Sequence, residues 1–581
     1  MLGFPGNGDM PLRPRIPART LLRRVRVDPP QGAASTDAIF ILMRRMRGPL
    51  VFLIAIFAID VLGLTIIPGV DADGNPVHMT YFDAFYFMSY TASTIGFGEL
   101  PNTFTVAQRM WVTFTIYTSV IGWAYAIGAF LGLMQDRTFS TAVTLQRFAR
   151  KVRGLREPFL IVAGYGQMGQ AVAAALDTQG RRIVVIDSDR DRLGSLSGGR
   201  LNVDVPGIQG DARDPETLGI AGLGHPFCEG VLAMTNDDQV NLSIVMSVQL
   251  LRPEVPVIAR SNDRSTVGAM RDFKAEAVIN PYDRFGSYLI LRLQRPATYR
   301  FVMWMMSNYD TALPPLTAGE RDGRWVVVGD DAFGEEISGD LSDAGLDVTM
   351  SSVRDGMPDV ADAVGFVAGS ADDATNLSLA AHARLQNPRI FLSVRQKSAR
   401  TQPLLKAFDP ESVFVPAQLT VREALARVIT PDFWEFIEWA SERDNAFSET
   451  LLEHVVGRCG EGSPESKRIR LDRTTTPGVH WWFDHGYELR LGDLLRDPDD
   501  RSLYLPVVCL GLRRTGGFHF VPDEDELLAP GDELLLAGRF EGFTTVMHTL
   551  FDESRIEYVS TGRQVPSSWL WRKLSSRVSE V

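Results

Sequence analysis

A short run of threonine and glycine residues lies between two apolar segments and has the composition of a cation-binding loop. It follows residues 81–93, an aromatic stretch short enough for a half-helix. Its members are Thr94, Ile95, Gly96, Phe97 and Gly98. A dehydrated cation needs a cage of oxygen atoms, which stacked backbone carbonyls and a threonine hydroxyl can supply. All carbonyls point to one side when successive residues alternate between left- and right-handed backbone, which glycine tolerates at Gly96 and Gly98.

This loop resembles the signature of potassium channels, commonly written TxxTxGYGD. The residues at its fixed positions are Thr91, Thr94, Gly96 and Gly98. The departures are Ile95 for Val, Phe97 for Tyr and Glu99 for Asp. The resemblance implies K⁺ as the permeant ion, held by oxygens of Thr94, Ile95, Gly96 and Phe97. It also implies a ring of four filter strands, and hence a homotetramer with cyclic symmetry.

Two apolar segments flank the loop and are long enough to cross a lipid bilayer. Residues 49–68 would span about 30 Å as a helix, and residues 107–133 about 40 Å. Basic residues precede the first segment and follow the second, whereas the loop between them is mainly acidic. The positive-inside rule then predicts a multi-pass protein of the cell (inner) membrane with both termini cytoplasmic. Two buried helices of a soluble enzyme are the alternative, which does not account for this charge pattern.

Three residues within the two spans are candidates for a special role. Gly122 and Gly128 are candidate gating hinges in the second span, although either could equally be a packing residue in a membrane helix. Asp60 in the first span is an intramembrane carboxylate to which no role is assigned.

A second glycine-rich loop has the setting of a dinucleotide-binding turn. The pattern GxGxxG at Gly164, Gly166 and Gly169 follows an apolar strand and opens an alanine-rich helix. Asp187 ends the next apolar strand, 18 residues after the last glycine. The glycines would let the backbone approach a pyrophosphate at the helix N-terminus, and Asp187 would accept hydrogen bonds from ribose hydroxyls. A carboxylate there disfavours a 2′-phosphate, so NAD(H) or an adenine nucleotide is predicted rather than NADP.

Further short motifs follow this fingerprint along the chain. Together with the fingerprint they resemble, over residues 157–283, the RCK (TrkA-N) family of cytosolic potassium-transport regulators. The predicted nucleotide site comprises Gly164, Tyr165, Gly166, Gln167, Met168, Gly169, Asp187, Ser188, Gly210, Asp211, Thr235, Asn236 and Arg260. Calcium-gated relatives carry acidic residues at the positions that match Met234, Arg260 and Asn262. This chain lacks those acidic residues. The acidic pairs Asp237-Asp238 and Asp372-Asp373 are interpreted as solvated loop charges rather than as cation ligands.

An internal repeat predicts a second, degenerate nucleotide fold. Gly329 and Gly334 match the first glycine loop at an offset of 165 residues. The later matches are Asp372-Asp373, Asn376, Arg395 and Pro416, at an offset of 135. The second copy has therefore lost about thirty residues, including any counterpart of Gly210-Asp211. Asp331 and Ser352 stand where the first copy has Gly166 and Asp187, and a carboxylate repels a phosphate. We therefore expect the second copy to be structural or to bind another ligand.

These observations predict a multidomain fold: an all-α two-span pore domain with a re-entrant loop, two α/β Rossmann-like RCK domains and an α+β TrkA-C-like lobe. The expected parts are a basic N-terminal segment (1–48), the pore domain (49–135, with pore helix 81–93 and filter 94–98), a linker (136–157), the first RCK domain (158–320), the second RCK N-lobe (321–430), a helical connector followed by a loop (431–476, the loop from 457), the C-terminal lobe (477–560) and a tail (561–581).

Composition excludes several classes of protein. The net charge of −12 argues against nucleic acid as a partner, and three widely spaced cysteines rule out a disulfide framework. None of the eight histidines adjoins a glycine-rich motif, so an NAD-dependent enzyme is not predicted. The predicted function is a potassium channel gated by a cytosolic nucleotide through a ring of RCK domains. The alternatives are gating by a divalent cation such as Ca²⁺, or a regulatory component of a potassium transporter.

Overall fold

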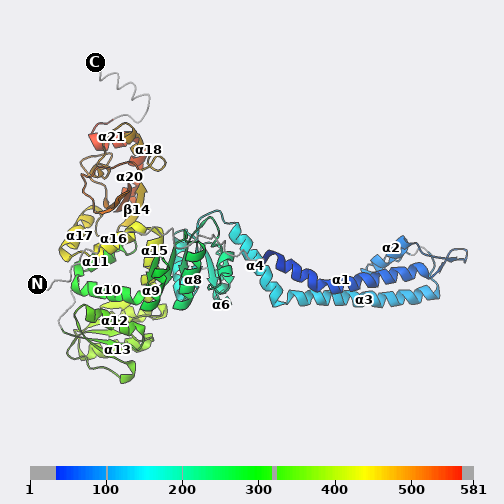
Figure 1. Ribbon diagram of the computed structural model, residues 1–581. Helices are drawn as coiled ribbons and strands as arrows, with labels where there is room; N and C mark the ends of the chain where they lie inside the picture. The colour runs from blue at the N-terminus through cyan, green and yellow to red at the C-terminus, as the bar shows by residue number, and fades with distance from the viewer. Residues whose placement is uncertain (1–33, 100–101, 199–200, 317–322, 565–581) are drawn as a thin grey trace, which may run out of the picture. The chain divides into compact units, whose positions relative to one another are not determined.

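The computed structural model describes residues 34–99, 102–198, 201–316 and 323–564 (Figure 1). Most of the predicted basic N-terminal segment and of the tail therefore lies outside the described residues. The chain divides into two compact units. One consists of Met1–Ile161, Val184–Leu193 and Val205–Cys228, and the other of Val162–Ile183, Gly194–Asp204 and Glu229–Val581.

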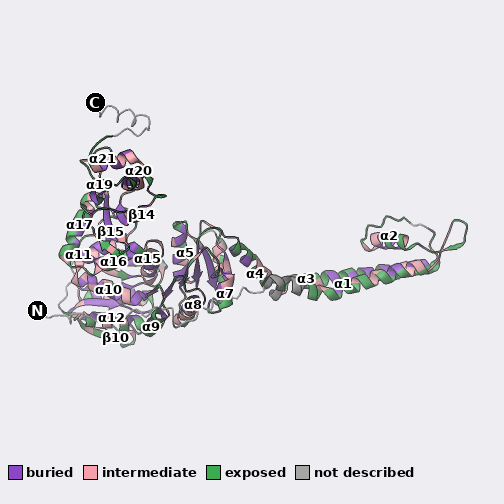
Figure 2. Ribbon diagram, turned by 45° about the horizontal axis from the view of Figure 1, so that its top comes forward, coloured by how far each residue is buried: buried purple, intermediate pink, exposed green. Residues whose placement is uncertain are grey.

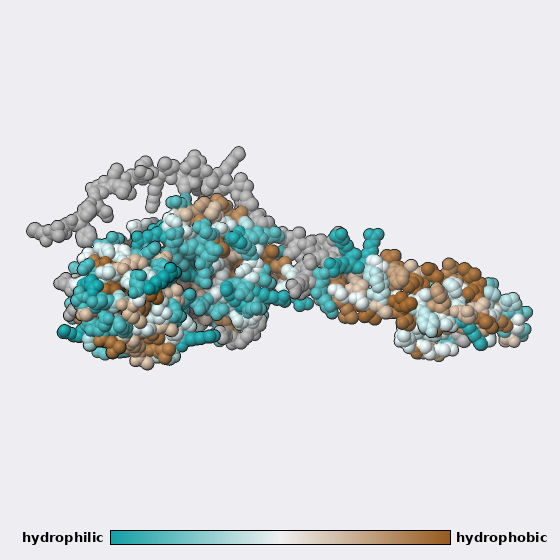
Figure 3. Space-filling view, turned by 90° about the horizontal axis from the view of Figure 1, so that it is seen from below, coloured by the Kyte–Doolittle hydropathy of each residue, from teal (hydrophilic) through white to brown (hydrophobic). Residues whose placement is uncertain are grey.

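The first unit begins with two long helices that lie side by side, α1 (Ala34–Ile66) and α3 (Val106–Met134), joined by a loop that contains α2 (Tyr81–Ala92) (Figure 1). Within them, Met43–Ile66 and Val106–Met134 are long and apolar enough to cross a membrane, and only 22% of the most apolar stretch of each is buried. Figure 2 shows exposed residues along both helices, and Figure 3 shows hydrophobic side chains on their surface. This exposed apolar surface is what a lipid-facing helix requires.

Helix α1 begins upstream of residue 49, where the sequence predicted the first span to start. Pro49 lies inside the helix rather than at its N-terminus. The second span begins where Thr105 accepts a hydrogen bond from the backbone N–H of Gln108, which caps α3. A linker helix, α4 (Arg137–Arg153), follows. The side chains of its Val152 and of Phe159 both lie against Gly222.

A six-stranded sheet has the strand order β5-β4-β3-β6-β7-β8, which is the order of a dinucleotide-binding fold. Its strands are β3 (Phe159–Ala163), β4 (Arg182–Asp187), β5 (Gly207–Gln209), β6 (Cys228–Ala233), β7 (Val257–Arg260) and β8 (Ala277–Ile279). Pairs β4–β5, β6–β7 and β7–β8 are parallel. The helices are α5 (Gln167–Thr178), α6 (Arg190–Gly194), α7 (Pro215–Ile220), α8 (Asp238–Leu251), α9 (Arg264–Asp272), α10 (Pro281–Gln294) and α11 (Pro296–Met305).

The second unit contains a five-stranded parallel sheet of order β10-β9-β11-β12-β13. Its strands are β9 (Arg324–Val328), β10 (Asp347–Ser351), β11 (Ala363–Ala368), β12 (Phe391–Arg395) and β13 (Ser412–Phe414). The helices are α12 (Ala332–Asp343), α13 (Asp373–Gln386), α14 (Gln402–Phe408), α15 (Pro416–Ile429) and α16 (Pro431–Ser441). Compared with the six-stranded sheet, it lacks a counterpart of the edge strand β5, which accounts for the thirty residues missing from the repeat.

In each copy, the helix that follows the last strand of the sheet packs on the helix that follows the glycine loop of the other copy. Helix α10, which follows the first sheet, packs on α12 of the second copy, and α15 packs on α5 of the first. Because α10 matches α15 at an offset of 135 and α12 matches α5 at 165, the two contacts are equivalent. The arrangement therefore has the form of a pseudo-two-fold pair, with an aromatic core that includes Phe285, Phe333 and Phe414.

A four-stranded antiparallel sheet of order β14-β17-β15-β16 completes the chain. Its strands are β14 (Glu465–Arg470), β15 (Val507–Arg514), β16 (Gly517–Phe520) and β17 (Glu533–Gly538), and its helices are α17 (Asn445–Cys459), α18 (Pro477–Asp484), α19 (Leu491–Leu494), α20 (Phe540–Phe551) and α21 (Glu553–Thr561). The sequence interpretation of residues 457–476 as a loop was wrong, because β14 lies there. Only Ile469 of that edge strand is buried, so its charged sequence carries little strand pattern.

Candidate functional site

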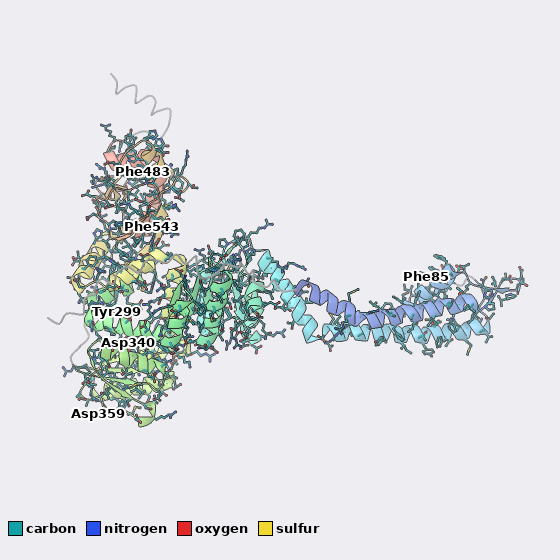
Figure 4. All side chains as sticks on the ribbon, in the orientation of Figure 1. Phe85, Tyr299, Asp340, Asp359, Phe483 and Phe543 are labelled. Atoms are coloured by element: carbon teal, nitrogen blue, oxygen red, sulfur yellow. The ribbon has the colours of Figure 1, made fainter. Side chains whose placement is uncertain are left out.

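Helix α2 positions the threonine–glycine loop. It begins at Thr80, whose hydroxyl oxygen accepts a hydrogen bond from the backbone N–H of Asp83. Ala84, Phe87, Met88 and Tyr90 are buried against Val61 and Leu64 of α1. On another face of α2, the ring of Phe85, labelled in Figure 4, meets Phe57 at 5.5 Å between centroids. The helix therefore holds the start of the loop at a fixed place between α1 and α3.

The loop backbone alternates in hand. Thr94, Gly96 and Gly98 have positive φ angles of 59°, 62° and 76°, whereas Ile95 and Phe97 are not among the positive-φ residues. The N–H groups of Ile95 and Gly96 both donate to the Tyr90 carbonyl, at 3.0 and 3.2 Å. The alternation expected at the two glycines is present, and it includes Thr94, whose left-handed backbone the sequence did not predict.

Two tyrosines of α2 hold the far end of the loop at Glu99. The Tyr90 hydroxyl donates to the Glu99 carbonyl at 2.5 Å, and the Tyr86 hydroxyl donates to the Glu99 carboxylate at 3.2 Å. The Tyr90 ring also lies edge-on to Phe97, with centroids 6.0 Å apart. Sequence reasoning missed both tyrosines. Their spacing of four residues, which places them on one helix face, is the pattern that could have revealed them.

The residues singled out in the spans have distinct surroundings. Helix α3 runs without interruption through Gly122 and Gly128. A Cβ on Gly122 would lie 3.2 Å from Leu53, whereas a Cβ on Gly128 would meet nothing within 4 Å. Gly122 is thus a packing residue at the α1 contact in this structure. Asp60 is buried, and the Thr118 hydroxyl lies 3.3 Å from both of its carboxylate oxygens.

The glycine loop after β3 leaves no room for a side chain at Gly164 or at Gly169. Gly164 has a φ of +93°, and a Cβ there would lie 2.9 Å from the Thr235 backbone. A Cβ on Gly169 would lie 1.8 Å from the Gly164 carbonyl oxygen. Gly166 is the N-cap of α5, and no side chain caps that helix. Of the intervening residues, Tyr165 and Met168 are buried and Gln167 is exposed. This is the cradle that a pyrophosphate at a helix N-terminus requires.

Asp187 lies at the carboxyl end of β4 and is buried. Its carboxylate accepts the Asp189 N–H at 2.7 Å and lies 3.7 Å from Arg192. The N–H of Gly210 donates to the Asp187 carbonyl at 3.0 Å, and a Cβ on Gly210 would collide with Thr217. The structure thus brings Asp187 and Gly210 together at adjacent strand ends.

Ser188 and Asp211 follow these two residues and are exposed. Asp211 accepts hydrogen bonds from Arg213, the shortest 2.6 Å long, which lower the pKa of the Asp211 carboxyl.

Thr235, Asn236 and Arg260 are joined in one network. Asn236 accepts a hydrogen bond from Arg260 Nη1 at 2.8 Å, and the Thr235 hydroxyl donates to Asn241 at 2.7 Å. The Asn241 amide donates to the carbonyls of Thr235 and Arg260. Arg260 is buried, and its Nε has no hydrogen-bond partner among the residues that the structure describes. Asn241 was not among the residues that the sequence predicted for the site.

The second copy repeats this network. The Asn376 amide donates to the carbonyls of Ser370 and Arg395 at 3.0 and 2.9 Å, the same distances as in the first copy. Arg395 Nη1 donates to Asp331, the residue at the position of Gly166, at 2.6 Å. Its Nη2 donates to the Tyr282 hydroxyl at 3.1 Å. The position that would face a phosphate therefore holds an internal ion pair.

The acidic pairs at the start of α8 and α13 accept hydrogen bonds from backbone N–H groups. Asp237 and Asp372 are the N-caps of the two helices. One Asp238 oxygen accepts the N–H groups of Asn262 and Asp263. Asp373 accepts the equivalent N–H groups of Lys397 and Ser398. The interpretation as solvated loop charges fits the exposed Asp237 and Asp372, which also cap their helices, but was wrong for Asp238 and Asp373, because their carboxylates bind backbone N–H groups of a following loop.

Comparisons with known proteins match two parts of the chain. Residues 50–136 match a family profile described as "Ion channel", and residues 160–281 match the "TrkA-N domain". Together they cover the α1–α3 segment and the six-stranded sheet.

Curated relatives cover part of this chain. "Potassium channel protein 1" of Methanocaldococcus jannaschii is 26% identical over 203 residues, which are 35% of this chain and 59% of the relative. "Voltage-gated potassium channel Kch" of Escherichia coli is 23% identical over 220 residues, 38% of this chain and 51% of the relative. A Methanothermus fervidus protein is 25% identical over 228 residues, 39% of this chain and 34% of the relative. The chain thus spans a third to three-fifths of the length of these relatives.

Among solved structures, "GsuK channel bound to NAD" aligns with 88% of this chain and 99% of its own, at 14% identity and a TM-score of 0.42. The two family profiles and the curated relatives confirm the two sequence resemblances, to potassium channel proteins and to the TrkA-N family. At the level of a helical pore-type region followed by Rossmann-like parallel sheets, the predicted fold class is also confirmed.

Proposed function

We propose, because the chain joins an ion-channel domain to a TrkA-N domain, that it is a potassium-selective channel whose opening depends on a nucleotide bound by the TrkA-N domain. The observation that carries this proposal is the backbone of Thr94, Gly96 and Gly98. Their left-handed conformations alternate with right-handed ones directly after a half-helix, between two helices long enough to cross a bilayer. Irregular backbone at that depth is tolerated only where it lines a pore or is buried in protein.

The loop would act as one strand of a selectivity filter. The carbonyl oxygens of Thr94, Ile95, Gly96 and Phe97, with the Thr94 hydroxyl, would replace the hydration shell of K⁺. In the single chain Ile95 and Phe97 are 61% and 65% exposed, so the strand needs neighbours. Four copies related by cyclic symmetry would enclose the ion, which makes the proposed assembly a homotetramer in the lipid bilayer with both termini cytoplasmic.

The regulatory ligand would be NAD(H) or an adenine nucleotide. The close approach at Gly164 and Gly169 supports a pyrophosphate cradle, and the buried carboxylate of Asp187 supports a ribose contact. The unpartnered Nε of Arg260 supports an acceptor from outside the described residues. Where the nucleotide is bound, these residues would orient it, and it would supply the free-energy difference between two arrangements of the regulatory domains.

Coupling to the pore would pass through α4, the helix between α3 and the six-stranded sheet. Its Val152 lies beside Phe159, the first residue of β3, so a shift of that strand would reach α4. A nucleotide opens the pore only to the extent that it binds the open arrangement more tightly. Gating by a divalent cation remains the alternative ligand class. The hydrogen bonds that Asp237, Asp238, Asp372 and Asp373 accept from backbone N–H groups do not favour it.

Ion flux into liposomes that contain the full-length protein tests the proposal. We expect K⁺ flux that Gly96→Ala abolishes, because that residue needs a left-handed backbone. The matched control is Gly132→Ala in α3, where a Cβ meets nothing within 4 Å. Added nucleotide should change the flux of wild type but not of Asp187→Ala. Persistence of flux in Gly96→Ala would contradict the filter assignment, and an unchanged nucleotide response in Asp187→Ala would contradict the ligand site.

A further inference from the structure

Three carboxylates meet where the first copy packs on the second. Asp283 lies on α10, and Glu336 and Asp340 lie on α12. One oxygen from each lies within 4.8 Å of the other two. Figure 4 labels Asp340 at this junction. Carboxylates at this separation repel one another when all are ionised.

Asp340 is the most constrained of the three. Its side chain is 13% exposed, and its Oδ1 accepts a hydrogen bond from Arg264 Nη2 at 3.0 Å. Its Oδ2 is buried and has no hydrogen-bond partner among the residues that the structure describes. A Cβ on Gly286 of α10 would lie 2.0 Å from that Oδ2. The absence of a side chain at Gly286 is therefore what lets the Asp340 carboxyl enter the helix contact.

The surrounding charges do not balance the cluster. Arg264 at the start of α9 is the cation that binds it, through Glu336 at 2.9 Å and Asp340. Asp343 adds a further negative charge from α12 itself. Arg271 and Arg284 line a cavity of about 300 Å³, which Asp283, Glu336 and Arg264 also line, but Arg284 is engaged by Glu423 at 2.9 Å. The strands on which α12 packs carry Arg324, which is bound to Asp362, and Asp347.

The equivalent junction on the other side of the pseudo-two-fold pair lacks the cluster. There α15 packs on α5, and the residues that match Asp283, Glu336 and Asp340 are Gln418, Ala171 and Ala175. Val421 stands where Gly286 stands. The helix contact therefore forms without a carboxylate at any of these three positions, and the acid cluster with its glycine notch is a specialisation of one junction.

We propose that the α10–α12 junction is a pH-sensitive switch, in which a proton on Asp340 strengthens the packing of the two copies. Burial, with Glu336 and Asp283 next in importance, raises the pKa of Asp340 from 3.8 to about 7. In an opened junction its pKa would return toward the ordinary value. Asp340 therefore binds its proton more tightly when the helices are packed.

The sign of the effect follows from this difference. Below pH 4 the carboxyl is protonated in both states and does not bias them. As the pH rises from about 4 to about 7, the opened junction releases the proton and the packed one retains it, so packing weakens. One proton limits the change in the opening equilibrium to about tenfold per pH unit. Above about pH 7 to 8 the effect levels off.

Hydrogen–deuterium exchange of the full-length protein measures this equilibrium directly. Peptides from α10 and α12 are followed between pH 5 and pH 8.5, with rates corrected for the intrinsic pH dependence of exchange. We expect their protection to fall as the pH rises toward 7, by up to about tenfold per unit. Peptides from α15 and α5, the junction that lacks this cluster, should show no such fall. The readout is independent of ion conduction, so its failure and the failure of the channel proposal are distinguishable.

Asp340→Asn should hold the junction in its low-pH state, protected at all pH values. Asp343→Asn removes the same charge from an exposed position of α12 and should keep the pH dependence. A second variant guards against misfolding of the first: Gly286→Ala should loosen the junction of wild type more than that of Asp340→Ala, because the clash is with the Asp340 carboxyl. Unchanged pH dependence in Asp340→Asn, or protection that rises with pH in wild type, would overturn the proposal.

Discussion

The Tyr90 hydroxyl donates a 2.5 Å hydrogen bond to the backbone carbonyl of Glu99, so that the last turn of α2 holds the outer end of the threonine–glycine loop. The same tyrosine accepts the N–H groups of Ile95 and Gly96 through its own carbonyl. One residue thus fixes both ends of the loop whose backbone alternates in hand. In the proposed filter, these hydrogen bonds would fix the positions of the carbonyl groups that replace the hydration shell of K⁺.

Tyr90→Phe should weaken discrimination between K⁺ and Na⁺. The variant loses one hydrogen bond, worth about 1 kcal/mol, while its ring keeps the contact with Phe97. We expect the permeability ratio to fall severalfold, measured from reversal potentials in planar bilayers. Tyr81→Phe is the matched control, since Tyr81 lies on the same helix and is 71% exposed. Equal ratios in wild type and Tyr90→Phe would show that this hydrogen bond does not support selectivity.

Gly169→Ala should abolish nucleotide binding. A Cβ at this position would lie 1.8 Å from the Gly164 carbonyl oxygen, so the glycine loop would have to move away from α5. Titration calorimetry with NAD⁺, NADH, ADP and ATP measures the loss. Gly268→Ala, in helix α9 with nothing within 4 Å, should bind as wild type does. Binding by Gly169→Ala at wild-type affinity would place the nucleotide elsewhere.

Asn241→Ala and Asn376→Ala should destabilise the protein to a similar extent. Each asparagine is fully buried and joins a helix to the ends of two strands through its amide. Loss of these hydrogen bonds leaves buried backbone groups unpaired, at a cost of roughly 2–4 kcal/mol in the free energy of unfolding.

Thermal unfolding of the two variants, beside the exposed Gln239→Ala, measures the difference. If Asn376→Ala proves neutral while Asn241→Ala does not, the two networks are not equivalent. They would then share a geometry but contribute differently to the stability of the protein.

Arg395→Ala should cost more stability than Asp331→Ala. Arg395 is buried and bonds to Asp331, Gly369 and Tyr282, while Asp331 remains partly exposed and can regain water. Denaturant unfolding of both variants gives the comparison. Asp331→Gly restores the glycine of the first copy but should not create nucleotide binding, because Ser352 still stands where the first copy has the carboxylate of Asp187. Nucleotide binding by that variant would show that the Asp331 carboxylate alone keeps the second copy from binding a nucleotide.

Much of the architecture could be predicted from spacing. The offsets of 165 and 135 residues predicted a shortened second nucleotide fold, and its sheet lacks one edge strand. The glycine pattern predicted the turn between β3 and α5, and a Cβ at Gly164 or Gly169 would meet backbone atoms there. These features were accessible because each depends on a residue type that tolerates one backbone geometry.

Contacts between distant side chains could not be predicted in the same way. The bond between Tyr90 and Glu99, the ion pair of Arg395 and Asp331, and the meeting of Asp283 with Asp340 each join separate elements. Strand β14 was missed because its residues are mostly charged and only Ile469 faces the core. An edge strand of this kind is defined by its partner, here β17, rather than by its own pattern.

The reversal potential of the wild-type protein in a planar bilayer, with K⁺ on one side and Na⁺ on the other, tests the central claim most directly. A filter built on Thr94, Gly96 and Gly98 predicts a current that reverses far toward the K⁺ equilibrium potential and disappears in Gly96→Ala. A current that reverses near zero under these conditions, or that is unchanged in Gly96→Ala, would contradict the account.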